Sequence, residues 1–199
     1  MALPGITSRA SGKTYEVVGR KAIFFDRDGV LTIPVIRDGR AFAPVNAEEF
    51  AVYQVAAEAV QRAQAAGFLC ILVTNQPDVA IGKTTKEFVE SMHLRLKTEL
   101  RLDDIEVSYD SSDSNAYRRK PNPGMLTESA QKWDIELRDS YLIGDTWRDI
   151  EAAHAAGCRA VYIDRLYENE IKTNPQHIDY VAKDVLDGVS WCIAQLERS

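Results

Sequence analysis

The feature that most constrains this chain is a short apolar segment that ends in two carboxylates. Residues Ala22 to Phe25 are all apolar, and Asp26, Asp28 and Gly29 follow. An unbroken apolar run of this length favours a strand buried on both faces, as in a parallel sheet. Ligands bind beyond the carboxyl ends of such strands, so we expect both carboxylates to lie at a crevice. Because close carboxylates repel each other, the pair predicts either a Mg²⁺ site or a nucleophile beside a general acid.

A solvated turn would also explain an isolated Asp-x-Asp pair, but two later apolar segments end in polar residues in the same way. One precedes Thr74, Asn75 and Gln76, whose hydroxyl and amide groups can donate hydrogen bonds to a phosphate. Another leads to Asp145, and Asp149 follows four residues later, one turn into an expected helix. These positions predict a second group of polar side chains at the same edge of the sheet.

Strand-like and helix-like segments alternate along the chain, which predicts a mostly parallel sheet with helices on both faces. Expected strands cover residues 21–26, 68–73, 105–109, 141–143, 160–163 and 178–181, and expected helices include 55–66, 125–133, 152–156 and 184–196. Residues 29–50 contain prolines, glycines and charges, and we expect a long loop there, close to the carboxylate pair. We treat residues 1–20 as an N-terminal lead-in and residues 21–199 as a single domain.

A further helix is expected from a capping-box pattern. Thr84 and Glu87 have the T-x-x-E spacing that marks a helix start. The apolar stripe of this helix would consist of Phe88, Met92, Leu96 and Leu100. His93 lies one position off the stripe, so we expect it on the surface.

Cations are concentrated before two prolines. Arg118, Arg119 and Lys120 precede Pro121 and Pro123 in a chain whose net charge is −6. A solvated basic turn is one interpretation, but in an acidic chain such a cluster also favours an anionic ligand. The overall acidity argues against nucleic acid or an anionic membrane as the main partner.

The three cysteines are far apart, and each has apolar neighbours, so we expect buried thiols and not a disulfide framework. No apolar stretch reaches the roughly 20 residues that cross a bilayer. The first residues lack the apolar core of a signal peptide, so we expect a cytoplasmic protein.

These segments occur in the order of the four motifs of the haloacid dehalogenase-like (HAD-like) phosphohydrolases, which the chain resembles. The motifs are D-R-D-G at 26–29, T-N-Q at 74–76, R-K-P-x-P-G-M at 119–125 and G-D-x-x-x-D at 144–149. In detail they are similar to those of subfamily IIIA, in the branch of the D-glycero-D-manno-heptose 1,7-bisphosphate 7-phosphatases and histidinol-phosphatases. The resemblance implies a three-layer, Rossmann-like, doubly wound α/β fold with no separate cap domain.

The resemblance also implies catalytic roles. Asp26 would attack phosphorus and form an aspartyl-phosphate. Asp28 would protonate the leaving sugar oxygen and later deprotonate the hydrolytic water. Thr74 and Lys120 would hold the transferring phosphoryl oxygens. Such a reaction depends mainly on positioning and charge stabilisation.

The remaining implied roles concern the metal and the substrate. Mg²⁺ would be held by the carboxylates of Asp26 and Asp145 and by the backbone carbonyl of Asp28. The expected substrate-binding residues are Asn75, Gln76 and Arg119, and Asp149 would support the site from behind.

One segment departs from the family pattern. Many relatives carry a zinc-binding loop before the R-K-P motif, and its four ligand positions correspond here to Ser108, Asp110, Ala116 and Arg118. None of these is Cys or His, so we expect no structural zinc. Residues 33–40 also differ from the corresponding region of the heptose enzymes, which leaves the substrate open.

The best-supported substrate is a phosphorylated sugar, with heptose 1,7-bisphosphate first. Alternative substrates are histidinol phosphate or another small phosphate ester. A different alternative is a zinc-less family member that binds a partner or ligand without turnover. The retained Asp26, Asp28, Lys120 and Asp145 argue against the last, because a binding module needs no nucleophile. We expect a monomer, as is common among such relatives.

Overall fold

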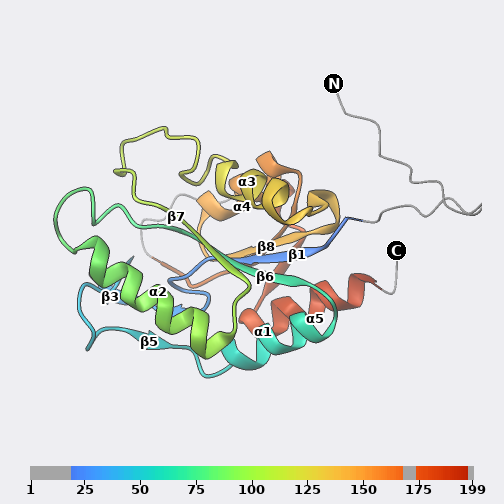
Figure 1. The fold of residues 1–199 in the computed structure, drawn as a ribbon, viewed down its shortest axis with the longest axis horizontal. Helices are drawn as coiled ribbons and strands as arrows, with labels where there is room; N and C mark the ends of the chain where they lie inside the picture. Colours follow the sequence, from blue (N-terminus) through green and yellow to red (C-terminus); the bar gives the residue numbers. More distant parts are fainter. Residues whose placement is uncertain (1–18, 168–173, 197–199) are drawn as a thin grey trace, which may run out of the picture.

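The computed structural model describes residues 19–167 and 174–196, which are coloured in Figure 1. The lead-in expected at residues 1–20 falls almost entirely outside the described residues. A six-stranded sheet forms the centre, in the order β10-β9-β8-β1-β6-β7. Every pair of neighbouring strands is parallel. The strands are β1 (Ala22–Phe25), β6 (Leu69–Asn75), β7 (Asp104–Ser108), β8 (Tyr141–Gly144), β9 (Arg159–Ile163) and β10 (Tyr180–Ala182).

The sheet is covered on both faces by helices, as Figure 1 shows. Side chains of α1, α2 and α5 belong to one apolar core, and those of α3 and α4 belong to the other. The expected three-layer arrangement is therefore confirmed. The helices are α1 (Ala56–Ala65), α2 (Lys86–Leu100), α3 (Gly124–Trp133), α4 (Trp147–Ala156) and α5 (Val185–Leu196), with short 3₁₀ turns at Leu137–Asp139 and Pro175–His177.

Strand β1 is apolar throughout because both of its faces are covered. Ile23 and Phe25 point into the core beneath α1, α2 and α5, whereas Ala22 and Phe24 point into the core beneath α3 and α4. All four side chains are fully buried. The strand pairs with β6 on one side and β8 on the other, so its carboxyl end lies beside theirs.

The long loop expected over residues 29–50 is instead partly ordered into strands. Strand β2 (Thr32–Ile33) pairs with β5 (Ala51–Val52), and β3 (Val35–Arg37) forms a hairpin with β4 (Arg40–Phe42). Asp38 and Gly39 connect the hairpin strands with φ values of 49° and 70°. This Asp-Gly pair is a strong local signal for such a hairpin turn.

The helix start expected at Thr84 is wrong by one residue. Thr85 is the N-cap, because its Oγ1 accepts a hydrogen bond from the Phe88 amide at 3.1 Å. Thr84 Oγ1 is buried and has no hydrogen-bond partner among the described residues. The Thr84–Glu87 pair therefore does not form a capping box.

Two composition-based expectations can be compared with the fold. All three cysteines, Cys70, Cys158 and Cys192, are buried free thiols, as predicted. Within the described part of the chain, no helix combines the length and the apolar character needed to cross a membrane.

Candidate active site

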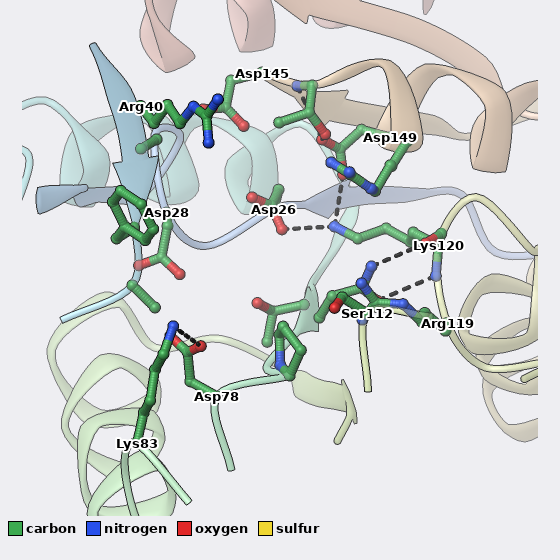
Figure 2. A pocket seen from close by; sticks show the side chains of 18 of the residues that line it. Asp26, Asp28, Arg40, Asp78, Lys83, Ser112, Arg119, Lys120, Asp145 and Asp149 are labelled. Atoms are coloured by element: carbon green, nitrogen blue, oxygen red, sulfur yellow. Dashed lines mark hydrogen bonds and ion pairs between the residues drawn. The ribbon is translucent and has the colours of Figure 1, made fainter. Parts of the chain in front are cut away.

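The expected polar residues meet at the carboxyl edge of the sheet. Asp26 follows β1, Thr74 lies near the end of β6, and Asp145 follows β8. With Lys120, which precedes α3, they line a cavity of about 550 Å³ (Figure 2). Three strand ends and the loop before α3 thus bring together four residues separated by as many as 119 positions in the sequence.

Lys120 is fixed by three acceptors. Its Nζ donates to Asp26 Oδ1 at 2.5 Å, to Asp149 Oδ1 at 2.6 Å and to the Val73 carbonyl at 2.8 Å. Only 3% of the side chain is exposed. Although burial alone would favour the neutral amine, the two carboxylates raise the pKa of Lys120 above its ordinary value. The ammonium is therefore a rigid, permanent positive charge beside Asp26.

The carboxylates at the site are crowded. Burial raises the pKa of Asp26 to about 7, with further contributions from Asp149 and Asp28, although Lys120 opposes the shift. Burial and the charges of Asp26 and Asp149 also raise the pKa of Asp145 well above its usual range. A cation placed between these groups would relieve this unfavourable crowding of negative charge.

A divalent cation fits this carboxylate cluster. One oxygen each from Asp26, Asp145 and Asp149 lies within 4.8 Å of the others. Asp145 Oδ1 is buried and lacks a hydrogen-bond partner among the described residues, whereas its Oδ2 accepts from the Tyr167 hydroxyl at 2.7 Å. A buried, unpartnered carboxylate oxygen is a suitable ligand for a hard cation such as Mg²⁺.

Asp149 contributes differently from the other two. Its Oδ1 receives Lys120, and its Oδ2 accepts from the Thr146 amide and hydroxyl at 3.1 and 2.8 Å. Both oxygens are therefore committed to protein donors, so Asp26 and Asp145 remain the best ligand candidates. Asp149 thus lies behind the site, as expected from its position one turn into α4.

Gly29 is needed because the chain passes directly over Asp145. A Cβ at this position would lie 1.7 Å from Asp145 Oδ2 and 2.8 Å from the Tyr167 hydroxyl oxygen. Its φ of 91° also lies in the left-handed region that favours glycine. The glycine of the D-x-D-G motif therefore leaves space for the carboxylate of Asp145.

Asp28 lines the cavity, and its carboxylate is hydrogen-bonded by side chains other than Lys120. Oδ2 accepts from Arg27 Nη2 at 2.8 Å and from Gln76 Nε2 at 3.2 Å. Oδ1 accepts from Arg27 Nε at 3.1 Å and from the Thr32 hydroxyl at 3.0 Å. The side chain is thus oriented by four neighbouring donors.

Sequence reasoning missed Arg27, and the surface position predicted for His93 is wrong. Arg27 is fully buried, and its Nη1 lies 3.2 Å from His93 Nε2. Only 2% of His93 is exposed, because the buried face of α2 runs along Val89, His93 and Leu96. This helical spacing was the available signal. Burial and the charge of Arg27 lower the pKa of His93 to about 4.

Asn75 and Gln76 have different surroundings. Asn75 lines the cavity, and its amide accepts from the Lys120 backbone N–H at 3.1 Å and donates to the Lys120 carbonyl at 2.9 Å. Gln76 is buried beneath the cavity, where it contacts Arg27, Asp28 and Thr74. Asn75 is therefore placed to hold the backbone of Lys120, and Gln76 does not line the cavity.

The three expected cations separate. Arg119 lines the cavity and donates to the Asp110 carbonyl at 3.1 Å. Burial and the nearby Arg148 lower the pKa of Arg119 below its ordinary value. Arg118 instead forms ion pairs with Glu106 and Glu128. Arg119 and Lys120 face the cavity, whereas Arg118 belongs to the wall of the loop.

Hydrogen bonds and ion pairs hold the segment of this chain that corresponds to the zinc-binding loop of many relatives. Ser108 Oγ donates to Asp110 Oδ2 at 2.7 Å, and Arg118 joins the loop to β7 through Glu106. The Asn122 amide donates to the Ala116 carbonyl at 2.9 Å.

Comparisons with known proteins identify the family. The HAD-hydrolase-like family matches residues 117–188. The D-glycero-D-manno-heptose-1,7-bisphosphate 7-phosphatase of Thermosynechococcus vestitus is 32% identical over 198 residues, which cover 89% of this chain and 97% of that protein.

The chain belongs to the HAD-like hydrolases.

As a HAD-like phosphatase, it is a phosphoric monoester hydrolase. The D-glycero-beta-D-manno-heptose-1,7-bisphosphate 7-phosphatase of Rhodopseudomonas palustris is 33% identical over 150 residues, covering 69% of this HAD-like chain and 80% of that enzyme. The histidine biosynthesis bifunctional protein HisB of Bacteroides fragilis is 31% identical, covering 77% of this chain and 43% of that protein.

The fold of this HAD-like chain is also similar to a solved structure. The D,D-heptose 1,7-bisphosphate phosphatase of B. bronchiseptica, complexed with magnesium and phosphate, has a TM-score of 0.74 and is 24% identical. The match covers 90% of this chain and 99% of that one. The mostly parallel α/β architecture is thus that of HAD phosphatases.

Proposed function

We propose that this HAD-like phosphatase hydrolyses a phosphorylated sugar, with D-glycero-D-manno-heptose 1,7-bisphosphate as substrate and the 7-phosphate as the group removed. The observation that carries the chemistry is the contact between Asp26 and the buried Lys120, 2.5 Å apart, beside an unpartnered oxygen of Asp145. The relatives named as heptose bisphosphate phosphatases support the choice of substrate. In the first step of the proposed reaction, Asp26 acts as the nucleophile.

In that step an Asp26 oxygen forms a bond to phosphorus, and the bond from phosphorus to the sugar oxygen breaks. Asp28 gives its proton to the departing oxygen. Water then attacks phosphorus, Asp28 takes a proton from it, and the bond to Asp26 breaks. In each step, hydrogen-bond donors that the chain already orients stabilise the negative charge on the reacting oxygens.

The carboxylates of Asp26 and Asp145, with the backbone carbonyl of Asp28, would hold Mg²⁺, which supplies neutralising charge for the phosphoryl oxygens. Lys120 holds Asp26 in place and faces the same oxygens. Thr74 offers its hydroxyl to them, and Arg119 reaches the substrate from the rim. These assignments require no structural zinc, because the hydrogen bonds of the 108–122 segment hold the loop.

Asn75 and Gln76 act in this proposal mainly by positioning. Asn75 holds the Lys120 backbone at the cavity wall, and Gln76 contacts Thr74 and Asp28 from beneath. Residues 21–199 form one catalytic domain without a separate cap, which is supported by the one six-stranded central sheet and its two helical layers. We further propose a cytoplasmic monomer, which size-exclusion chromatography and cell fractionation would check.

The experiment is phosphate release with Mg²⁺ from a small panel: both heptose 1,7-bisphosphate anomers, fructose 1,6-bisphosphate, histidinol phosphate and an aryl phosphate. We expect one heptose anomer to be preferred by about 10²-fold in kcat/KM. Asp26→Asn should abolish turnover, and Asp134→Asn, a matched change at the exposed end of α3, should not. Turnover by the Asp26 variant would contradict the covalent mechanism.

A second candidate substrate is histidinol phosphate, favoured by the similarity to HisB. A preference for this compound in the same panel would assign the chain to that activity. Absence of turnover on every member of the panel, with intact folding and Mg²⁺ present, would favour a binding role and overturn the proposal.

A further inference from the structure

The mechanism leaves a buried network beneath the cavity unexplained. Arg27 is fully buried, directly between two proposed reacting residues in the sequence. Its guanidinium donates to the Asp28 carboxylate and to Gln76 Oε1 at 2.8 Å. Because burial of a charged arginine is costly without full pairing, this group is expected to have a specific task.

The direction of the hydrogen bonds follows from the arginine. A guanidinium has only donors, so the group of Gln76 that faces Arg27 must be its carbonyl oxygen. The amide nitrogen of Gln76 then faces the opposite way. Its two N–H groups meet two acceptors, Asp28 Oδ2 at 3.2 Å and Thr74 Oγ1 at 2.9 Å. Arg27 thus fixes which end of the Gln76 amide meets Thr74.

The orientation of the Gln76 amide determines how the Thr74 hydroxyl is used at the cavity. Since Thr74 Oγ1 accepts from Gln76, its own proton must be donated elsewhere. Among residues 19–167 and 174–196, that hydroxyl donates no hydrogen bond to a protein acceptor, and Thr74 lines the cavity. The proton is therefore available to an anion in the cavity.

The contact between Arg27 and His93 is also determined by the guanidinium having only donors. His93 Nε2, 3.2 Å from Arg27 Nη1, must be an acceptor, so the imidazole carries its single proton on Nδ1. A neutral His93 adds no competing charge to the network. Every polar neighbour of the guanidinium thus accepts from it, which leaves the Gln76 amide one orientation.

We propose that Gln76, oriented by Arg27, is a positioning residue that makes Thr74 a permanent hydrogen-bond donor to the phosphoryl group while holding the Asp28 carboxylate in place. This inference rests on the proposed phosphatase function, because it takes the phosphoryl oxygens as the acceptor. It links the general acid and the phosphate-binding hydroxyl through one amide.

The test is Gln76→Glu. At about pH 8 a glutamate is ionised and has acceptors only, so it keeps the pairing with Arg27 but takes the Thr74 proton away from the cavity. We expect kcat/KM to fall about 10²-fold, the scale for one lost donor to a reacting oxyanion. Binding of inorganic phosphate with Mg²⁺, measured by calorimetry, should weaken about tenfold. Gln131→Glu, on the exposed face of α3, is the matched control for added charge.

A double-mutant cycle with Thr74→Ala separates this role from charge repulsion. If Gln76 acts through Thr74, the effect of Gln76→Glu on phosphate binding should largely disappear once the hydroxyl is absent. Gln76→Met, which adds no charge, should show the same dependence on Thr74 and serves if the glutamate variant does not fold. An effect equal with and without the hydroxyl, or no larger than that of Gln131→Glu, would overturn the proposal.

The failure of the proposed function would look different. If the wild-type protein releases no phosphate from any substrate, the assignment as a phosphatase fails, yet the phosphate-binding cycle still tests the hydrogen-bond direction. If the wild-type protein is active and the cycle shows no coupling, only the role of Gln76 is wrong.

Discussion

Lys120 is held at both its ammonium and its backbone. Its side chain meets three acceptors, and its main-chain N–H and carbonyl are both bound by the Asn75 amide. A lysine with this many contacts loses little entropy on meeting a substrate, since its rotamers are already fixed. The position of the charge therefore depends on Asn75 as well as on the carboxylates.

Asn75→Ala removes both backbone contacts and should lower kcat/KM by about tenfold, the effect of losing hydrogen bonds near a charged group. Steady-state kinetics with the preferred substrate would measure this, with circular dichroism as the folding control. Asn75→Asp keeps the acceptor but loses the donor, so its loss should be of the same sign. Wild-type kinetics in the alanine variant would show that Lys120 does not need this support.

Tyr167 offers a separate test of the proposed metal site. Its hydroxyl donates to Asp145 Oδ2 and thereby orients the other oxygen. Tyr167→Phe should weaken Mg²⁺ affinity by about tenfold, as loss of a hydrogen bond to a ligating group commonly does. The Mg²⁺ dependence of the unfolding temperature provides a readout that does not require turnover. Unchanged Mg²⁺ dependence would argue against Asp145 as a ligand.

The residues whose positions were predicted correctly and those whose positions were missed differ in how these positions arise. Asp26, Thr74 and Asp145 could be predicted because each comes at the end of an apolar strand, and parallel strands bring such ends together. Arg27 could not be placed, because its burial results from α2 packing over the segment after β1. His93 was placed on the surface because it lies one position off the expected apolar stripe, although its spacing from Val89 and Leu96 indicated the buried face. A polar residue beside an apolar stripe is normally exposed.

At the scale of elements, the start of α2 provides a matched pair of threonines. Thr85 caps the helix, whereas Thr84 Oγ1 is buried without a partner among the described residues. Thr85→Ala should therefore lower the free energy of unfolding by about 1 kcal/mol. Thr84→Ala should change it by no more than about 0.5 kcal/mol. Urea denaturation of both variants is the measurement, and equal effects would contradict the cap assignment.

The boundary of α2 and the hairpin of residues 35–42 show why local patterns were insufficient. Thr84 and Thr85 both have cap-forming side chains, and only the backbone geometry, extended at Thr85, selects between them. For the hairpin, prolines and charges obscured the Asp38-Gly39 turn. Hairpin strands of three residues are too short for their alternation to stand out.

At the scale of the whole molecule, His93 should make stability depend on pH. Burial lowers its pKa from 6.5 to about 4, so between these values the unfolded chain binds a proton that the folded chain does not. The contribution of His93 to stability should therefore rise with pH across this window and be lost as pH falls, by about 3 kcal/mol in total. The raised pKa values of Asp26 and Asp145 act in the opposite direction over the same window.

The measurement is the free energy of unfolding between about pH 4 and pH 7. His93→Gln, which keeps an acceptor for Arg27, removes this contribution and should lower the slope of stability against pH relative to the wild type. His154→Gln, at an exposed position on α4, is the control for losing an imidazole. If the wild type and His93→Gln have the same slope, the buried histidine does not account for the pH dependence.

The layered architecture was predictable because helical and strand periods alternate along the chain, and all six expected core strands form. The order of the strands was not, because it depends on how the helices pack across the two faces. Strand β1 comes first among the core strands but lies inside the sheet, between β6 and β8. This central position places Asp26 between Thr74 and Asp145.

Because Gly29 packs directly against Asp145, the substitutions that position 29 tolerates depend on a residue far away in the chain. A methyl group there would collide with Asp145, 116 positions later, and with the hydroxyl of Tyr167. In a library of random variants selected for activity, even alanine at Gly29 should be absent. A shorter residue at 145 would make space but would remove the carboxylate. Glycine at position 29 therefore cannot be replaced by a single substitution, or by a second substitution at position 145, with the site kept intact.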